Sequence, residues 1–329
     1  MSTKIQFSRA GGPEVLEFKE VPLPQPGASE VRIQVKAIGI NRAEAMWRID
    51  DYIEPVNFPA GLGYEAAGIV DAVGAGVTGI NVGDRVNVIP SFSMNQYGTY
   101  GDQVIVPDYA VVPHPQMLSW EEAASVWMMF VTAYAALIDD AKIKAGDVVV
   151  IPAASSSVGL AAIQIARRAG AVAVALTRTD AKVAQLRDVG ASHVIVTSTS
   201  DVVEEIRRIS EGRGADMVFD PVGGADFAKL ISSLGFLGKA YIYGALSPTP
   251  TALPVLEMIA KMTTVKAHNI WGVSGDAQRR KEAVEYVLSG LESGELKPII
   301  DRVFTFEAMR EAHQYLEQNG QFGKVVVSV

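Results

Sequence analysis

A run of small residues suits the binding of a phosphate, and it follows the first of several apolar segments that read as buried strands. The run consists of Ala153, Ala154, Ser155, Ser156, Ser157, Val158 and Gly159. It stands where a dinucleotide-binding unit carries its GxGxxG turn, with Gly159 at the last glycine and Ala154 and Ser156 at the first two. Small side chains would let the backbone approach a pyrophosphate, which serine hydroxyls and a helix N-terminus could hold. A strand-to-helix turn capped by serines would use the same residues, so both interpretations stay open.

The end of the second apolar segment bears on the choice between the two nicotinamide cofactors. An acidic residue there would bind the ribose 2′-hydroxyl of NAD, whereas this chain has Thr177 followed by Arg178. A guanidinium can bind a 2′-phosphate with two hydrogen bonds, and Lys182 lies one helical turn further on. Solvated charges at a helix start are the alternative, although cations are disfavoured at that end. These residues favour NADP(H) over NAD(H).

Composition excludes several other kinds of chemistry. The 329 residues include no cysteine, which rules out a disulfide framework, a cysteine-ligated metal and a thiol nucleophile. The four histidines stand far apart and form no metal-binding spacing. A formal net charge of −8 argues against nucleic acid as a partner. Because we find neither a run of about 18 apolar residues nor a basic leader before an apolar stretch, we expect no membrane association and a cytoplasmic location.

Two kinds of pattern divide the chain. Up to about residue 120 it shows short alternating stretches, such as 31–37, among glycine and proline turns, which predicts β-strands. At Ser119 a capping box with Glu122 begins an apolar helix. Apolar runs then alternate with helical segments, which is typical of a parallel sheet buried on both faces. These runs are 148–151, 171–176, 193–196, 216–219 and 240–243. The pattern predicts a doubly wound α/β domain inserted into a mostly β domain, and the chain ends in a strand-like segment, 324–329.

Several short motifs occur together in a characteristic order. They are GGPEVL at 11–16, VKAIGIN at 35–41, LGYEAAG at 62–68, VGDRV at 82–86, TAY at 132–134, DPVGG at 220–224, LKPIIDRVF at 296–304 and FGKVVV at 322–327. With these motifs the chain resembles, over essentially its whole length, the zinc-independent, quinone oxidoreductase-like branch of the medium-chain dehydrogenase/reductase superfamily.

The resemblance implies a GroES-like, mostly β catalytic domain and a Rossmann NADP-binding domain. We expect residues 1–122 and 266–329 to form the catalytic domain and residues 123–265 to form the Rossmann domain. Zinc-dependent relatives carry a cysteine and then an acid just after the strand that ends near Gly39, and a histidine before the glutamate at position 65. The corresponding segments here, 39–44 and 63–65, lack these ligands, so the resemblance implies a reaction without zinc.

The resemblance also implies roles for individual residues. Asn41 would be a positioning or hydrogen-bonding group near the nicotinamide, and Tyr52 and Tyr64 would bind a carbonyl or donate a proton. Simple packing is the alternative for each tyrosine. Met46 replaces a further family tyrosine, which indicates a more apolar pocket. Lys324 would either reach the cofactor phosphate or form a surface ion pair. The remaining implied cofactor contacts are Thr132, Gly223, Tyr243, Gly244 and Ala245.

These observations predict an NADPH-dependent oxidoreductase that transfers hydride to a small molecule, either a quinone or an α,β-unsaturated carbonyl compound. The alternatives are a zinc-free, NADP-linked alcohol or aldehyde oxidoreductase and a non-catalytic NADPH-binding sensor. The aromatic segment 91–101 would either set substrate choice or be an ordinary surface loop. The resemblance suggests a homodimer that forms around residues 241–270.

Overall fold

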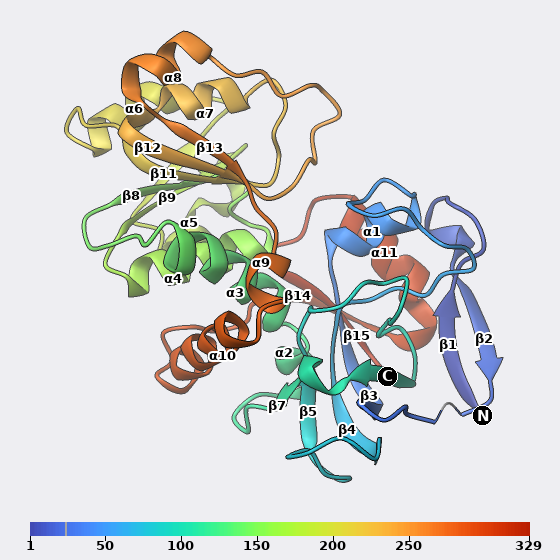
Figure 1. The fold of residues 1–329 in the computed structure, drawn as a ribbon. Helices are drawn as coiled ribbons and strands as arrows, with labels where there is room; N and C mark the ends of the chain where they lie inside the picture. Colours follow the sequence, from blue (N-terminus) through green and yellow to red (C-terminus); the bar gives the residue numbers. More distant parts are fainter. Residues whose placement is uncertain (24) are drawn as a thin grey trace. The chain divides into compact units, whose positions relative to one another are not determined.

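The computed structural model describes residues 1–23 and 25–329, and these residues divide into two units (Figure 1). Unit 1 contains Met1–Val131 and Val273–Val329, and unit 2 contains Thr132–Gly272. The chain passes from one unit to the other within α3 (Trp127–Tyr134) and returns within α9 (Trp271–Ser274). The expected boundaries at 122 and 265 fall nine and seven residues before these divisions.

Unit 2 is built on a six-stranded parallel sheet with the order β10-β9-β8-β11-β12-β13. Val150 of β8 lies opposite Val174 of β9 on one side and Val218 of β11 on the other. The strand order reverses between β8 and β11, and open parallel sheets bind ligands beyond the carboxyl ends of the strands at such a point. The strands are β8 (Val148–Ile151), β9 (Val172–Thr177), β10 (His193–Val196), β11 (Ala215–Asp220), β12 (Leu234–Ile242) and β13 (Thr264–Ala267).

The five apolar runs predicted as strands are confirmed, but the prediction missed β13. This strand lies at the edge of the sheet, and its residues Thr264 and Lys266 are exposed. An edge strand that faces solvent needs no apolar run, and so it gives no hydrophobic signal.

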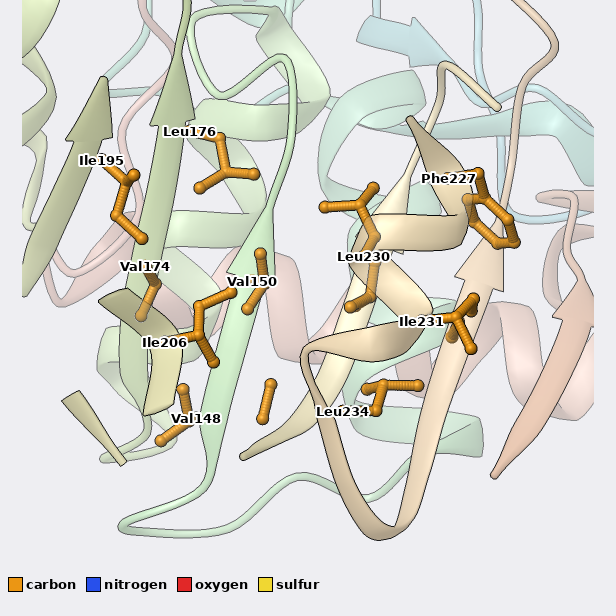
Figure 2. Close-up of a cluster of buried hydrophobic side chains, with 13 residues drawn as sticks. Val148, Val150, Val174, Leu176, Ile195, Ile206, Phe227, Leu230, Ile231 and Leu234 are labelled. Atoms are coloured by element: carbon orange, nitrogen blue, oxygen red, sulfur yellow. The ribbon is translucent and has the colours of Figure 1, made fainter. Parts of the chain in front are cut away.

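Helices cover both faces of the unit 2 sheet, with α4 and α5 on one face and α6, α7 and α8 on the other (Figure 1). Figure 2 shows the core under the second group, where Ile206 of α6 and Leu230 of α7 belong to one buried cluster with Val148, Val150 and Val174 of the sheet. The helices are α4 (Ser157–Arg168), α5 (Val183–Val189), α6 (Val202–Ile209), α7 (Phe227–Ser232) and α8 (Val255–Lys261).

Unit 1 contains a seven-stranded sheet with the order β14-β15-β3-β4-β5-β7, in which β6 also pairs with β3, and a two-stranded sheet of β1 and β2. Gly39 of β3 lies opposite Glu65 of β4 on one side and Val326 of β15 on the other. Three distant parts of the sequence therefore meet where β3 ends. The strands are β1 (Ser2–Gln6), β2 (Glu17–Val21), β3 (Glu30–Ile40), β4 (Glu65–Val73), β5 (Arg85–Val88), β6 (Gln103–Pro107), β7 (Val111–Pro113), β14 (Ile300–Thr305) and β15 (Lys324–Ser328).

The helices of unit 1 lie between its strands in the sequence. The predicted capping box is confirmed, because Ser119 Oγ accepts a hydrogen bond from the Glu122 amide at 3.2 Å and the Ser119 amide donates to Glu122 Oε2 at 2.9 Å. Among the described residues, one stretch, Trp120–Asp140, is long and apolar enough to cross a bilayer, but 78% of its most apolar window is buried inside the fold. The helices are α1 (Arg42–Arg48), α2 (Trp120–Ala123), α10 (Ala277–Glu292) and α11 (Met309–Glu317).

Candidate functional site

The small-residue run forms a tight turn between β8 and the N-terminus of α4. Ser156 caps the helix, because its Oγ accepts a hydrogen bond from the Gly159 amide at 3.1 Å. A Cβ at Gly159 would lie 2.8 Å from Ala153 O and from Ala154 Cα, so only glycine fits this close approach. The turn therefore combines the serine cap with the close backbone approach and helix N-terminus that a pyrophosphate requires.

The end of β9 lies beside this turn. Lys182 Nζ donates a hydrogen bond to Ser155 Oγ at 3.1 Å, although the two residues are 27 positions apart. Thr177 is the last residue of β9, and its Oγ1 donates to Thr179 O at 3.1 Å, while Arg178 is exposed to solvent. Lys182 therefore contacts the phosphate turn, whereas the Arg178 side chain is exposed to solvent, where a bound ligand could reach it.

A buried polar atom without a partner occurs at the end of β11. Asp220 is buried there, and its Oδ2 accepts a hydrogen bond from the Gly223 amide at 2.6 Å. Among the described residues Asp220 Oδ1 has no hydrogen-bond partner, whereas the buried Tyr243 hydroxyl interacts with Ser156 of the phosphate turn. Burial raises the pKa of Asp220, and burial together with the Asp220 charge raises the pKa of Tyr243. Buried polar atoms usually have partners, so Asp220 at the switch point fits a polar ligand.

The remaining cofactor candidates of unit 2 lie in the loops after β11 and β12, except Thr132, which lies on α3. A Cβ at Gly244 would lie 2.6 Å from Pro221 O, which brings the loops after β11 and β12 into contact. Gly223 adopts a positive φ of 65°, a conformation that favours glycine. Ala245 is exposed, and Thr132 is buried on α3. Together with the phosphate turn, these features fit a dinucleotide such as NADP(H).

Unit 1 contains a buried cluster of charged and amide side chains where β3, β4 and β15 meet. Lys324 Nζ donates a hydrogen bond to Asn41 Oδ1 at 2.5 Å and forms an ion pair with Glu65 Oε1. Glu65 Oε2 accepts a hydrogen bond from the Met128 amide at 3.0 Å. Glu44 accepts hydrogen bonds from the Asn41 amide at 2.7 Å, from Asn41 Nδ2 at 3.1 Å and from the Tyr64 amide at 3.2 Å.

This cluster holds a buried, ionisable carboxyl. Glu44 and Glu65 are both fully buried, and Lys324 forms an ion pair with Glu65 while its charge also acts on Glu44. Desolvation raises the pKa of Glu44 to about 7, against the opposing effect of Lys324. Sequence reasoning did not single out Glu44, although its spacing from Asn41 is that of a helix capping box and could have signalled it.

The two candidate tyrosines lie in a chain of aromatic rings. The ring centroid of Tyr64 is 6.4 Å from that of Tyr52 and 6.0 Å from that of Phe92. Tyr64 is buried, and its hydroxyl interacts with that of Tyr52. Burial raises the pKa of Tyr52 to about 12, and burial and Tyr52 raise that of Tyr64, so both stay protonated near neutral pH. Ser93, next to Phe92, donates a hydrogen bond from its Oγ to Glu54 at 2.8 Å.

The structure brings Asn41, Tyr64 and Lys324 together through Glu44 and Glu65. The expectation of a surface ion pair for Lys324 is wrong, because its side chain is only 1% exposed. Its ammonium is committed to Glu65 and Asn41, so we leave Lys324 out of the proposed cofactor site. Across residues 1–23 and 25–329, no group of three or more His, Cys, Asp or Glu side chains is placed to hold a metal ion.

Two family descriptions match the chain, one for each kind of domain. The alcohol dehydrogenase GroES-like domain matches residues 27–116, and the zinc-binding dehydrogenase family matches residues 157–293. The structure is accordingly a GroES-like β domain combined with a Rossmann-type parallel-sheet domain. The chain belongs to the medium-chain dehydrogenase/reductase superfamily, among its quinone oxidoreductase-like members.

Known proteins similar to this chain agree with that class. The synaptic vesicle membrane protein VAT-1 homolog of Rattus norvegicus is 31% identical over 335 residues, which cover 96% of this chain and 81% of that protein. A solved NAD-dependent alcohol dehydrogenase is 32% identical, with a TM-score of 0.92 and 100% of both chains covered. Escherichia coli quinone oxidoreductase in complex with NADPH is 29% identical, with a TM-score of 0.90, and the match covers 99% of this chain and 100% of that one. The chain is accordingly an oxidoreductase of this superfamily, and both the Escherichia coli protein and a mycobacterial protein with 26% identity were solved in complex with NADPH.

Proposed function

We propose that the protein reduces a quinone or an α,β-unsaturated carbonyl compound. The observation that supports this proposal best is the buried pair of neutral tyrosines, Tyr52 and Tyr64, whose hydroxyls interact and whose rings lie in one aromatic chain with Phe92. Neutral hydroxyl donors suit a carbonyl oxygen, and flanking aromatic rings suit a flat conjugated molecule.

The proposed roles follow from the protonation states of these side chains. Because their pKa values are raised, Tyr52 and Tyr64 are neutral donors that would stabilise the negative charge developing on the acceptor oxygen. NADPH supplies the hydride when it is bound. Asn41 would help to orient the reacting groups, since its own amide is held by Lys324 and Glu44.

The cofactor would be held by the loops of unit 2. We place the pyrophosphate at the turn from Ser155 to Gly159, at the N-terminus of α4. Arg178, with Thr177 and Lys182, would bind the 2′-phosphate, because two cations and a hydroxyl lie at the end of β9. Thr132, Val158, Gly223, Tyr243, Gly244 and Ala245 would complete the cofactor contacts.

One specific observation supports a second candidate function. The likeness to a solved NAD-dependent alcohol dehydrogenase, with a TM-score of 0.92, supports oxidation of an alcohol or reduction of an aldehyde without zinc. The two candidates differ in their substrates, so a panel of acceptors separates them.

The experiment is to follow NADPH oxidation at 340 nm with quinones, enones and aldehydes, and to repeat it with NADH. We expect turnover of quinones or enones with NADPH and a clear preference over NADH. The variant Tyr64→Phe should lower kcat for the carbonyl acceptors without changing the affinity for NADPH. Turnover of aldehydes alone would favour the second candidate, and tight NADPH binding without turnover of any acceptor would contradict both.

We also propose a cytoplasmic homodimer. Among the described strands β13 pairs with β12 only, and α8 nearby carries exposed apolar side chains at Val255, Leu256 and Ile259. An open edge and exposed apolar residues on one protomer suit the same surface of a second copy related by a two-fold axis. Sedimentation should give a dimer for the wild type and a monomer for Leu256→Asp/Ile259→Asp, and a monomeric wild type would contradict the proposal. Cell fractionation tests the location.

A further inference from the structure

The strongest unexplained feature is a lysine ammonium buried where three strands end. Lys324 begins β15, Glu65 begins β4, and Asn41 follows β3, so the ladder register brings the three side chains together. Burying a lysine is unfavourable unless its charge is paired and its protons are donated. Glu65 supplies the opposite charge, and Asn41 Oδ1 accepts a second hydrogen bond at 2.5 Å.

The partners of Asn41 specify one orientation of its side-chain amide. An ammonium can only donate hydrogen bonds, so the oxygen of the amide must face Lys324. A backbone carbonyl can only accept them, and Nδ2 lies 3.4 Å from Gly39 O and 3.1 Å from Glu44 Oε1, so the nitrogen faces Gly39 and Glu44. Reversing the amide would place its NH₂ group against the ammonium and its oxygen against the carboxylate. Lys324 and Glu44 therefore hold the amide from opposite sides.

Charge balance alone does not require this arrangement. Glu65 already pairs with the Lys324 charge, and Asn41 is neutral. The contact between Lys324 and Asn41 thus adds orientation rather than charge compensation. The backbone of β3 also packs closely against this cluster. A Cβ at Gly39 would lie 2.0 Å from Ala124 O and 2.9 Å from Glu65 Oε1, so there is little space between β3 and the Glu65 side chain.

We propose that Lys324 is a positioning residue that fixes the orientation of the Asn41 amide for the reaction. The inference rests on the proposed function, in which Asn41 orients the reacting groups. Lys324 acts through Asn41 and touches neither substrate nor cofactor. Its burial and its two partners separate it from the cations at the end of β9, which would bind phosphate.

The test separates positioning from a merely structural ion pair. The variant Lys324→Met/Glu65→Gln removes one positive and one negative charge, so the buried cluster keeps its charge balance. We expect this double variant to keep most of the thermal stability that Lys324→Met alone loses, while kcat falls about 10- to 100-fold, the range for groups that orient a reactive residue. The KM for NADPH should not change. Recovery of both stability and kcat in the double variant would overturn the proposal.

Lys324→Arg is the conservative control. Its guanidinium keeps a donor for Asn41 and a charge for Glu65, so we expect a folded protein with kcat closer to the wild type than that of the double variant. A folded Lys324→Arg protein with kcat 10- to 100-fold below the wild type would contradict positioning. Because this comparison is made with the wild type, it decides the matter even if the double variant fails to fold.

A readout without turnover distinguishes failure of this inference from failure of the proposed function. The side-chain amide signals of Asn41 in a ¹⁵N–¹H spectrum can be assigned by their loss in Asn41→Ala. We expect these signals to shift in Lys324→Met/Glu65→Gln and to remain near their wild-type positions in Lys324→Arg. Unchanged signals in the double variant would overturn the role of Lys324, whereas wild-type protein that reduces no acceptor would refute the proposed function instead.

Discussion

The buried carboxyl of Glu44 leads to a prediction for the pH dependence of stability. It lies in the first turn of α1 and accepts three N–H hydrogen bonds, yet desolvation raises its pKa from 4.5 to about 7. The unfolded chain therefore releases this proton near pH 4.5 and the folded chain near pH 7. At about 1.4 kcal/mol per pKa unit, Glu44 should lower the free energy of unfolding by about 3 kcal/mol as the pH rises from 4.5 to 7.

His313 titrates in the opposite sense. Burial and the Arg48 charge lower its pKa from 6.5 to about 3. Its contribution to stability is complete above pH 6.5 and is lost as the pH falls toward 3, which amounts to about 3 kcal/mol at pH 4.5. The two groups therefore largely cancel in the wild type between pH 4.5 and 7. Replacing Glu44 with glutamine should leave the loss caused by His313 unopposed.

The assay is urea unfolding of the wild type and Glu44→Gln between pH 4.5 and 8, followed by tryptophan fluorescence, to which the buried Trp47 on the same helix contributes. Relative to the wild type, the free energy of unfolding of the variant should rise by about 3 kcal/mol from pH 4.5 to 7.5. Glu292→Gln, at an exposed position, is the control and should follow the wild type. Parallel curves for Glu44→Gln and the wild type would refute the reasoning.

Three further substitutions test the cofactor site and the core. Arg178→Ala should weaken NADPH binding by about 1.5–3 kcal/mol, or roughly 10- to 150-fold, with little effect on NADH, and calorimetry showing equal losses for both cofactors would contradict the assignment. Gly159→Ala would place a Cβ 2.8 Å from Ala153 O and Ala154 Cα and so distort the turn. Fluorescence titration should then show weaker NADPH binding, and an unchanged affinity would argue against close approach of the cofactor to the backbone at this turn. Ile231→Ala empties part of the buried cluster on unit 2 and should lower the free energy of unfolding by about 2–5 kcal/mol in urea, whereas a change below about 0.5 kcal/mol would show that the site is not close-packed.

Much of the fold could be predicted because its signals are local. Five strands of the parallel sheet appear as apolar runs, and the Ser119 cap is visible as a spacing of three residues. The edge strand β13 could not be found this way, because Thr264 and Lys266 face solvent and leave no apolar pattern. The opposite edge strand, β10, carries the apolar residues 194–196 and was found, so exposed polar residues rather than the edge position alone remove the signal.

The candidate site likewise has a part that is local in sequence and a part that depends on the fold. The phosphate turn is a short segment, so its small residues and Gly159 identify it without any knowledge of the fold. The contact of Lys324 with Asn41 joins residues 283 positions apart and depends on the register of β15 against β3. A sequence pattern gives the residue types at both positions, but only the ladder shows that the lysine is buried and which partners it has.

Transfer of a labelled hydride is the measurement that tests the proposed reaction most directly. NADPH carrying deuterium at C4 of the nicotinamide, prepared in each of the two stereochemical forms, would be incubated with the protein and an enone, and the product would be analysed by mass spectrometry and NMR. We predict that one of the two forms delivers deuterium to the β-carbon of the enone, while the α-carbon takes up a proton from the solvent. NADPH that binds but delivers deuterium from neither form, to the enone or to a quinone, would contradict the assignment of this protein as a quinone or enone reductase.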